Sequence, residues 1–358
     1  MAETFTLSEL VVPGTYVRVS AEGLIGAAAI STGNIGMVGT AATADGETHL
    51  LGDFASARAG FGASDGYQNG AGTLNLTRGL ELAYRNGARS VYAQGLPAGA
   101  DQADFAAAFD EVIKDDVNIL IAPELSTADA LAVLGPALET AENAGRDMIA
   151  VVGTDATTTA AMLAQVPTND RIVFTAPGIM AFDPVAQDVV ALSGTYAAAA
   201  VAGLLSTLSP QQSPTNKVLP GVVRLARRFS YAESIQLLNG RIAVLEQRGG
   251  VRVVRGLTTD DGAFRQVTTR RITDFAKAGM RKASDPFIGR LNNQRVRKAL
   301  YGAIDGFLTT MLQDEQLTGY NLEVTATRQD EIAGRAQVNA VLRPTFSIDF
   351  VAVTMVLE

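Results

Sequence analysis

The sequence contains no cysteine and no tryptophan, and it has a single histidine, His49. Without cysteine, disulfide bonds, thiolate metal sites and a cysteine nucleophile are excluded. Long apolar runs are also missing. The longest, residues 196–205, is rich in alanine and falls short of the roughly 18 residues that a membrane-spanning helix needs. We therefore expect a buried helix there and no insertion into a membrane.

Signals for catalysis are scarce as well. A Ser-His-Asp triad would have to use His49. Asp45, Glu47 and His49 alternate along the chain and could ligate a metal, but one histidine beside surface carboxylates most often binds none. The sequence has no phosphate-binding G-x-x-x-x-G-K-[ST], no G-x-S-x-G and no H-E-x-x-H. It therefore predicts no catalytic residue, no metal site and no cofactor.

One glycine-rich segment, GNIGMVG, is similar to a dinucleotide-binding loop. Its glycines, Gly33, Gly36 and Gly39, have the spacing G-x-x-G-x-x-G and not G-x-G-x-x-G. No acidic partner for a ribose follows at the required distance. Close packing of the backbone explains these glycines better than a nucleotide does.

Charge is distributed unevenly along the chain. Residues 1–200 carry 8 Lys+Arg and 23 Asp+Glu, a net charge of −15, whereas residues 201–358 carry 21 and 14, a net charge of +7. Such asymmetry indicates two surfaces with different neighbours. The two halves could attract each other inside one molecule, or the basic half could present a face to an acidic partner.

The chain of 358 residues exceeds the usual size of one hydrophobic core, so two domains are expected. Between residues 77 and 206, apolar strand patterns such as VNILIAPEL and DMIAVVGT alternate with helical patterns. This alternation is typical of an α/β fold with a largely parallel or mixed sheet. The Pro/Ser-rich stretch STLSPQQSPTNKVLPG predicts a domain boundary near residue 210.

The second half has the pattern of an α+β domain. The segments GVRVVRGLTT and AFRQVTTRRI flank Asp260-Asp261-Gly262, which predicts a β-hairpin. The segments ITDFAKAGMRKA and QRVRKALYGAIDGFLTTMLQ have the spacing of amphipathic helices. We expect an α/β domain over residues 23–210 and an α+β domain over residues 211–345.

Both ends of the chain have the composition of strands, and we predict an N-terminal arm (1–22) and a C-terminal arm (346–358). The last segment, FSIDFVAVTMVLE, is apolar on both faces, which is an aggregation hazard unless the strand is paired. It could pair within its own subunit or be added to a neighbour's sheet. If the arms were added to a neighbour, the arm residues in contact with other subunits would be Phe5, Leu7, Val11, Val12, Tyr16, Val17, Phe346, Ile348, Phe350, Val351, Val353 and Met355.

The order of motifs resembles that of the contractile tail sheath proteins of bacteriophages and phage-tail-like particles. An L-x-G-V element (219–222) leads to Leu-Asn-Gly (238–240) and then to a G-x-x-V-x-x-G-x-T-T strand (250–259). The same order continues with Arg271 and Asp274, Ile288-Gly289, Asn292, Asn293, Arg295, Arg297 and the strand GYNLEV. The earlier segments VVPGTYVRV, ISTGNIGMVGTA and LTRGLELAYRNGARSVYAQ fit the same proteins, so the resemblance covers nearly the whole chain.

The resemblance implies a structural, non-enzymatic subunit. Such a subunit polymerises helically around an inner tube and contracts to drive the tube through a target envelope, using energy stored at assembly. The implied partners are further copies of the chain, the inner tube protein, and baseplate and terminator proteins, with no nucleic acid and no membrane insertion. The protein would be made in the bacterial cytoplasm and then become part of a virion tail, a tail-like bacteriocin or an extracellular injection system.

The resemblance also implies positions for the domains. The acidic α/β domain would lie outside, the basic domain would face an acidic tube, and both arms would complete β-sheets of neighbouring subunits. The basic residues assigned to the tube-facing surface are Arg270, Arg271, Lys277, Arg281, Lys282, Arg295, Arg297 and Lys298. Two other classes of function remain as alternatives: an α/β nucleotide-binding enzyme that uses the GNIGMVG segment, and a soluble adaptor domain.

Overall fold

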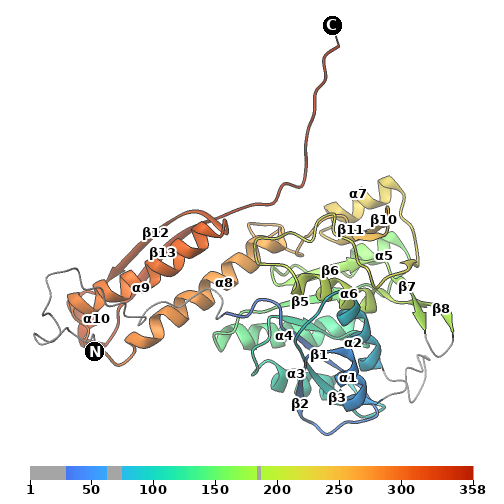
Figure 1. Cartoon of the computed structure of the whole chain (residues 1–358), viewed down its shortest axis with the longest axis horizontal. Coiled ribbons are helices and arrows are strands. Elements are labelled where there is room, and N and C mark those ends of the chain that lie inside the picture. The colour runs from blue at the N-terminus through green and yellow to red at the C-terminus, as the bar shows by residue number, and fades with distance from the viewer. Residues whose placement is uncertain (1–29, 63–74, 184–186, 358) are drawn as a thin grey trace, which may run out of the picture. The chain divides into compact units, whose positions relative to one another are not determined.

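The computed structural model describes residues 30–62, 75–183 and 187–357. Their contacts form two compact units (Figure 1). The first, called the α/β unit, comprises residues 30–278 together with 344–357. The second, called the C-terminal unit, comprises residues 279–343.

An eight-stranded sheet forms the centre of the α/β unit, in the order β11-β10-β6-β5-β4-β1-β3-β2. Neighbouring strands from β10 to β3 are parallel, and the edge strands β11 and β2 are antiparallel. The strands are β1 (Ile35–Thr40), β2 (Thr48–Leu51), β3 (Val91–Leu96), β4 (Ile119–Ile121), β5 (Ile149–Gly153), β6 (Ile172–Ala176), β10 (Ala243–Gln247) and β11 (Val251–Val253). The prediction of an α/β fold with a largely parallel or mixed sheet is confirmed.

Helices cover both faces of this sheet, because successive strand residues point to opposite faces and both sets are apolar. In β4, Ile119 and Ile121 pack into one core with α1, α2 and α6, whereas Leu120 packs into a second core with α3, α4, α5 and α7. The helices are α1 (Phe54–Phe61), α2 (Asn75–Arg85), α3 (Gln102–Val112), α4 (Thr127–Asn143), α5 (Thr159–Ala164), α6 (Gly194–Ser206) and α7 (Tyr231–Asn239). The alanine-rich α6 is buried along nearly its whole length, as predicted.

A small antiparallel sheet of β7 (Ile179–Asp183), β8 (Asp188–Leu192) and β9 (Arg224–Leu225) completes the α/β unit, in the order β8-β7-β9. None of the helices in the described ranges is both long and apolar enough to cross a membrane.

The structure divides the chain at a different place from the boundary expected near residue 210. Strands β10 and β11 lie well beyond that residue, yet they extend the eight-stranded sheet, with β10 parallel to β6. The Pro/Ser-rich stretch belongs to the α/β unit, and the amide of Leu219 within it donates a hydrogen bond to the Val251 carbonyl oxygen at 2.7 Å. Loop composition alone does not distinguish a linker between domains from a crossing within one.

The predicted hairpin around residues 260–262 is wrong in its second half. The residues after the turn form the helix α8 (Val267–Ser284), and a single bridge between Leu257 and Gln266 joins the two sides. Helical spacing buries Ile272 and Ala276 completely. This burial outweighs the β propensity of the threonines at the start of the helix.

The helix α8 begins in the α/β unit and ends in the C-terminal unit. The C-terminal unit continues with α9 (Gln294–Gln313), β12 (Leu317–Thr325), α10 (Arg328–Ile332) and β13 (Gln337–Pro344). Strands β12 and β13 form a two-stranded sheet beside α9 (Figure 1). A Cβ atom at Gly279 would lie 1.8 Å from the Phe307 ring, so glycine at this position lets α9 pack directly on the end of α8.

Candidate assembly surfaces

The C-terminal tail, residues 345–357, is extended and forms no strand with any part of the chain that the structure describes (Figure 1). The apolar side chains predicted to contact other subunits are 63–85% exposed, and these are Phe346, Ile348, Phe350, Val351, Val353 and Met355. Such a long exposed apolar segment is unusual in a monomeric soluble protein. The N-terminal residues of the same prediction, Phe5, Leu7, Val11, Val12, Tyr16 and Val17, lie outside the described residues.

The two-stranded sheet of the C-terminal unit offers edges to which a strand could be added. Within the described ranges, β12 and β13 pair only with each other, so each strand keeps one unpaired edge. In β13, Val338 and Val341 are 37% and 63% exposed, whereas Leu317 and Leu322 of β12 are buried. A sheet of two strands is marginally stable by itself, and further strands would stabilise it.

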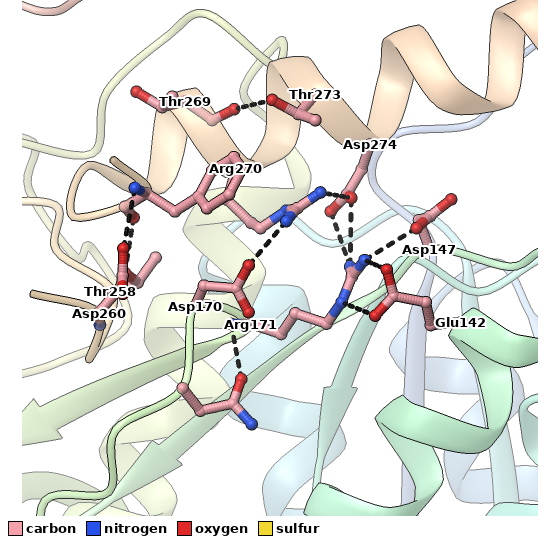
Figure 2. Close-up of polar contacts among 12 residues, drawn as sticks. Glu142, Asp147, Asp170, Arg171, Thr258, Asp260, Thr269, Arg270, Thr273 and Asp274 are labelled. Atoms are coloured by element: carbon pink, nitrogen blue, oxygen red, sulfur yellow. Dashed lines mark hydrogen bonds and ion pairs between the residues drawn. The ribbon is translucent and has the colours of Figure 1, made fainter. Parts of the chain in front are cut away.

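A network of charged side chains joins the first half of α8 to the rest of the α/β unit. At its centre the Arg171 guanidinium, whose side chain is 4% exposed, lies 2.7 Å from Glu142 and 2.8 Å from Asp147. It also lies 3.1 Å from Asp274 of α8 (Figure 2). Arg270 continues the network with ion pairs to Asp274 at 2.6 Å and to Asp170 at 2.7 Å. The network connects α4, the residues just before β5 and β6, and α8.

Two further basic residues of α8 are also bound within the α/β unit. Lys277 forms ion pairs with Glu142, at 2.9 Å, and with Asp147. Arg271 is buried, and its Nη2 donates hydrogen bonds to the carbonyl oxygens of Thr32 and Leu208 at 2.9 and 2.8 Å. Burial lowers the pKa of Arg271 to about 10.

The prediction that Arg270 and Arg271 face a tube is therefore wrong, since their side chains are buried inside the subunit. Lys277 is partly buried, and carboxylates of the same unit balance its charge. A count of charges along the sequence could not reveal this, because Asp170 lies 100 positions before Arg270 and Glu142 lies 135 positions before Lys277.

The other basic residues of the prediction lie in the C-terminal unit. Arg281, Lys282, Arg295 and Lys298 are exposed. Arg297 donates hydrogen bonds to Asn292 at 2.8 Å and to Glu331 at 3.0 Å, which fixes its side chain inside this unit. Neither Arg295 nor Lys298 forms an ion pair with another described residue. These two side chains remain the strongest candidates for contact with an acidic surface.

The glycine-rich segment does not have the geometry of a nucleotide-binding loop. Gly36 and Gly39 lie inside β1, and the next element along the chain is β2 and not a helix. A Cβ atom at Gly36 would lie 2.8 Å from Val112, and one at Gly33 would lie 2.1 Å from the Ser206 carbonyl oxygen. The prediction that close packing explains these glycines is confirmed.

The candidate metal site around His49 gains no support from the structure. His49 Nε2 lies 2.8 Å from Asp45 Oδ2, and both side chains are exposed. Among the residues of known placement, no group of three His, Cys, Asp or Glu side chains could hold a metal ion.

Two family models match the chain. The model of the phage tail sheath protein central domain matches residues 98–259, and the model of the phage tail sheath C-terminal domain matches residues 259–358. The chain belongs to the phage tail sheath family. It is a structural sheath subunit, as the order of its motifs predicts. No curated protein sequence matches it.

Solved structures of sheath proteins have the same fold as this sheath subunit. The contracted helical sheath of the anti-feeding prophage matches with a TM-score of 0.75 and 20% identity, over 97% of this chain and 99% of that chain. The contracted sheath complex of PVC, an extracellular contractile injection system, matches with a TM-score of 0.71 and 16% identity, over 99% of each chain. The sheath tail protein of Desulfitobacterium hafniense matches with a TM-score of 0.65 and 12% identity, over 93% of this chain and 100% of that chain.

The charged network of the sheath subunit predicts a defined response to acid. Hydrogen bonds from Arg171 and Lys277 lower the pKa of Glu142 from 4.5 to about 2. Between pH 4.5 and about pH 2, the Glu142 carboxyl group binds more protons in the unfolded chain than in the folded chain. The stabilisation that this residue contributes is therefore full above pH 4.5 and is lost as the pH falls through about 2. Because the Glu142 side chain is 44% exposed, the contribution stays within about 1 kcal/mol.

We expect Glu142→Gln to flatten the dependence of the melting temperature on pH between pH 5 and pH 2. Glu139→Gln is the matched control, because Glu139 is exposed on the same helix and forms no ion pair with the described residues. Circular dichroism melts at several pH values measure the effect. Identical pH profiles for wild type and Glu142→Gln would contradict the assignment.

Proposed function

We propose that the sheath subunit is not an enzyme and that it polymerises helically around an inner tube. The exposed C-terminal tail carries this proposal most directly, because a segment apolar on both faces is costly to leave in water. In the proposal the sheath contracts and drives the tube through a target envelope. It is made in the bacterial cytoplasm and assembled into a virion tail or a phage-tail-like particle, with baseplate and terminator proteins at its ends.

We propose that neighbouring copies are joined by strand addition. The tail of one subunit lies along the edge of the β12–β13 sheet of another, and the N-terminal arm (1–22) takes part in the same mesh. Main-chain hydrogen bonds supply affinity in this mode, and alternate side chains set the register. Each hydrogen bond contributes only about 1 kcal/mol, so strength comes from repetition along the sheath.

The energy for contraction is proposed to be stored at assembly. The segment that could have held a nucleotide is instead packed against Val112 and Leu76 in the α/β unit. A small difference in free energy between extended and contracted subunits, multiplied over the whole sheath, would drive the motion. The contacts between copies would have to persist through it, which extended strand connections allow.

We propose that the C-terminal unit faces the tube and that Arg295 and Lys298 contribute to the contact. Both residues lie in the first two turns of α9, where the helix dipole is positive. Cations at this end destabilise a helix by about 0.3–1 kcal/mol, so their presence is better explained by an anionic partner than by stability. Exposed charges act over about 8 Å at physiological salt, so such a contact can be released.

Reversing these two charges, in the double variant Arg295→Glu/Lys298→Glu, is expected to give sheaths that contain no inner tube or that contract prematurely. The substitutions place acidic residues at the positive end of α9, so the subunit should stay folded. The matched control is Arg224→Glu/Arg228→Glu, which reverses two exposed arginines of the α/β unit. Electron microscopy of co-expressed sheath and tube gives the fraction of extended particles. If the α9 variant still holds extended sheath on the tube at high salt, the contact lies elsewhere.

The size of the native particle tests the proposal against its alternatives. A sheath subunit is expected in assemblies of very many copies, whereas a nucleotide-binding enzyme or an adaptor would remain a small oligomer. Sedimentation of the purified chain, with and without nucleotide, distinguishes these cases. A small oligomer that binds nucleotide at stoichiometric levels would overturn the proposed function.

A further inference from the structure

The first part of the tail lies with its polar face toward the α/β unit. Phe346, Ile348 and Phe350 are 63%, 81% and 79% exposed. Between them, Ser347 and Asp349 are partly buried, and the Asp349 side chain is only 5% exposed. Side chains of an extended segment alternate between two faces, and burial normally favours the apolar one. Here the orientation is reversed, and the apolar face is turned outward.

The cause of this orientation is a set of three side chains that holds Asp349 and that we call the socket: Thr215, Arg255 and Gln266. Asp349 Oδ2 lies 2.6 Å from Arg255 Nε and accepts a hydrogen bond from Gln266 Nε2 at 3.2 Å. The Thr215 hydroxyl donates to Asp349 Oδ1 at 3.4 Å. A carboxylate this well buried stays in place only because these groups compensate for its loss of water.

The socket also holds the tail on either side of Asp349. Gln266 accepts a hydrogen bond from the Ser347 amide at 3.2 Å and donates to its carbonyl oxygen at 3.3 Å. On the other side, the Arg255 guanidinium lies 5.1 Å from the centre of the Phe350 ring, within range of a cation–π contact. Residues 347–350 are therefore fixed, whereas residues 351–357 form no such contact with the part of the chain that the structure describes.

We propose that Asp349 and its socket form a latch that sets the register and the face with which the tail is presented to a second copy of this chain. The proposal rests on the proposed function, because the second copy is the partner that strand addition requires. A shift of one residue would move every apolar side chain of a strand to the opposite face. By fixing Asp349 inward, the latch turns Phe346, Ile348 and Phe350 outward toward the partner.

The latch has a second physical consequence. A free tail would have to lose conformational entropy over its whole length when it binds, whereas the latched tail has already lost it at residues 347–350. Segments fixed in their bound conformation bind more tightly because this cost is not incurred again. Asp349 is thus a positioning residue for assembly, and it does not itself need to touch the partner.

The first test uses the full chain below its assembly concentration. We compare wild type, Asp349→Asn and Arg255→Gln with the control Arg248→Gln, which changes an exposed arginine of the neighbouring β10–β11 turn. Chymotrypsin cleavage after Phe346, followed by mass spectrometry, reports opening of the latch. Asp349→Asn and Arg255→Gln should accelerate it about tenfold, corresponding to about 1.4 kcal/mol, and Arg248→Gln should not. Cleavage within residues 351–357 is the internal reference and should be unchanged.

The second test measures the concentration above which each variant assembles, by light scattering. Asp349→Asn and Arg255→Gln should assemble only at a protein concentration about ten times higher than wild type or Arg248→Gln requires. This factor corresponds to the same free-energy change as the expected increase in cleavage. Unchanged cleavage in both latch variants overturns the latch. Faster cleavage with unchanged assembly overturns its role in presenting the tail. If wild type itself never assembles, the proposed function fails, while the cleavage experiment still decides whether the latch exists.

Discussion

Replacing Arg171 by glutamine is expected to lower the free energy of unfolding by about 3–5 kcal/mol, the usual cost of removing one partner from a buried ion pair. Among the described residues, Arg171 is the one cation that contacts all three carboxylates, those of Glu142, Asp147 and Asp274. Asp147 and Asp274 have side chains only 2% and 12% exposed, so water cannot replace the guanidinium. Burial raises the pKa of Asp274, and the positive charges of Arg270 and Arg171 partly offset this rise. Replacing Arg171 should therefore raise the pKa of Asp274 further.

Urea unfolding followed by circular dichroism measures this loss. Arg228→Gln is the control, since Arg228 is exposed and forms no ion pair with a described residue. A substitution at such a position usually changes stability by no more than about 0.5 kcal/mol. Equal midpoints for Arg171→Gln and Arg228→Gln would show that the network contributes nothing to stability.

Removing residues 346–358 is expected to abolish assembly of a continuous sheath and to leave a folded, soluble subunit. The buried cores of both units lie outside this segment, and its apolar side chains are exposed in the subunit. A shorter truncation after Phe350, which keeps Asp349 in its socket, should also fail to assemble normally, because it removes most of the strand that neighbours are proposed to bind. Circular dichroism and electron microscopy report folding and assembly. Normal sheaths from either truncation would mean that the tail is dispensable.

The sequence predicted the α/β unit well where local pattern decides the outcome. The apolar strands of β4, β5 and β6 are buried on both faces, and such runs are recognisable without knowledge of their partners. It failed where distant residues decide. Strands β10 and β11 join the sheet through pairing with β6, and no local signal separates this from a second domain.

The same distinction explains the errors at the candidate site. The i, i+4 spacing of Arg270 and Asp274 was a visible sign that Arg270 is paired within its helix, but its contact with Asp170 was not. The alternation of the tail was visible as well. Which of its faces turns inward depends on Thr215, Arg255 and Gln266, whose positions only the fold brings together.

The most direct test of strand exchange uses the absence of cysteine from the chain. Two double variants each carry a cysteine at Val353 in the tail and a second cysteine at Val338 or at Val341 of β13. The three single-cysteine variants are the controls. Assembled sheaths of each variant are oxidised. Residues directly opposite each other on adjacent strands have Cα atoms about 4.5–5.5 Å apart, which is within the range that a disulfide spans. If strands are exchanged, at least one of the double variants should give a ladder of covalent multimers on a denaturing gel, while the variants with a single cysteine should give none. Assembled sheaths that yield only uncross-linked or internally cross-linked monomers for both pairings would contradict it.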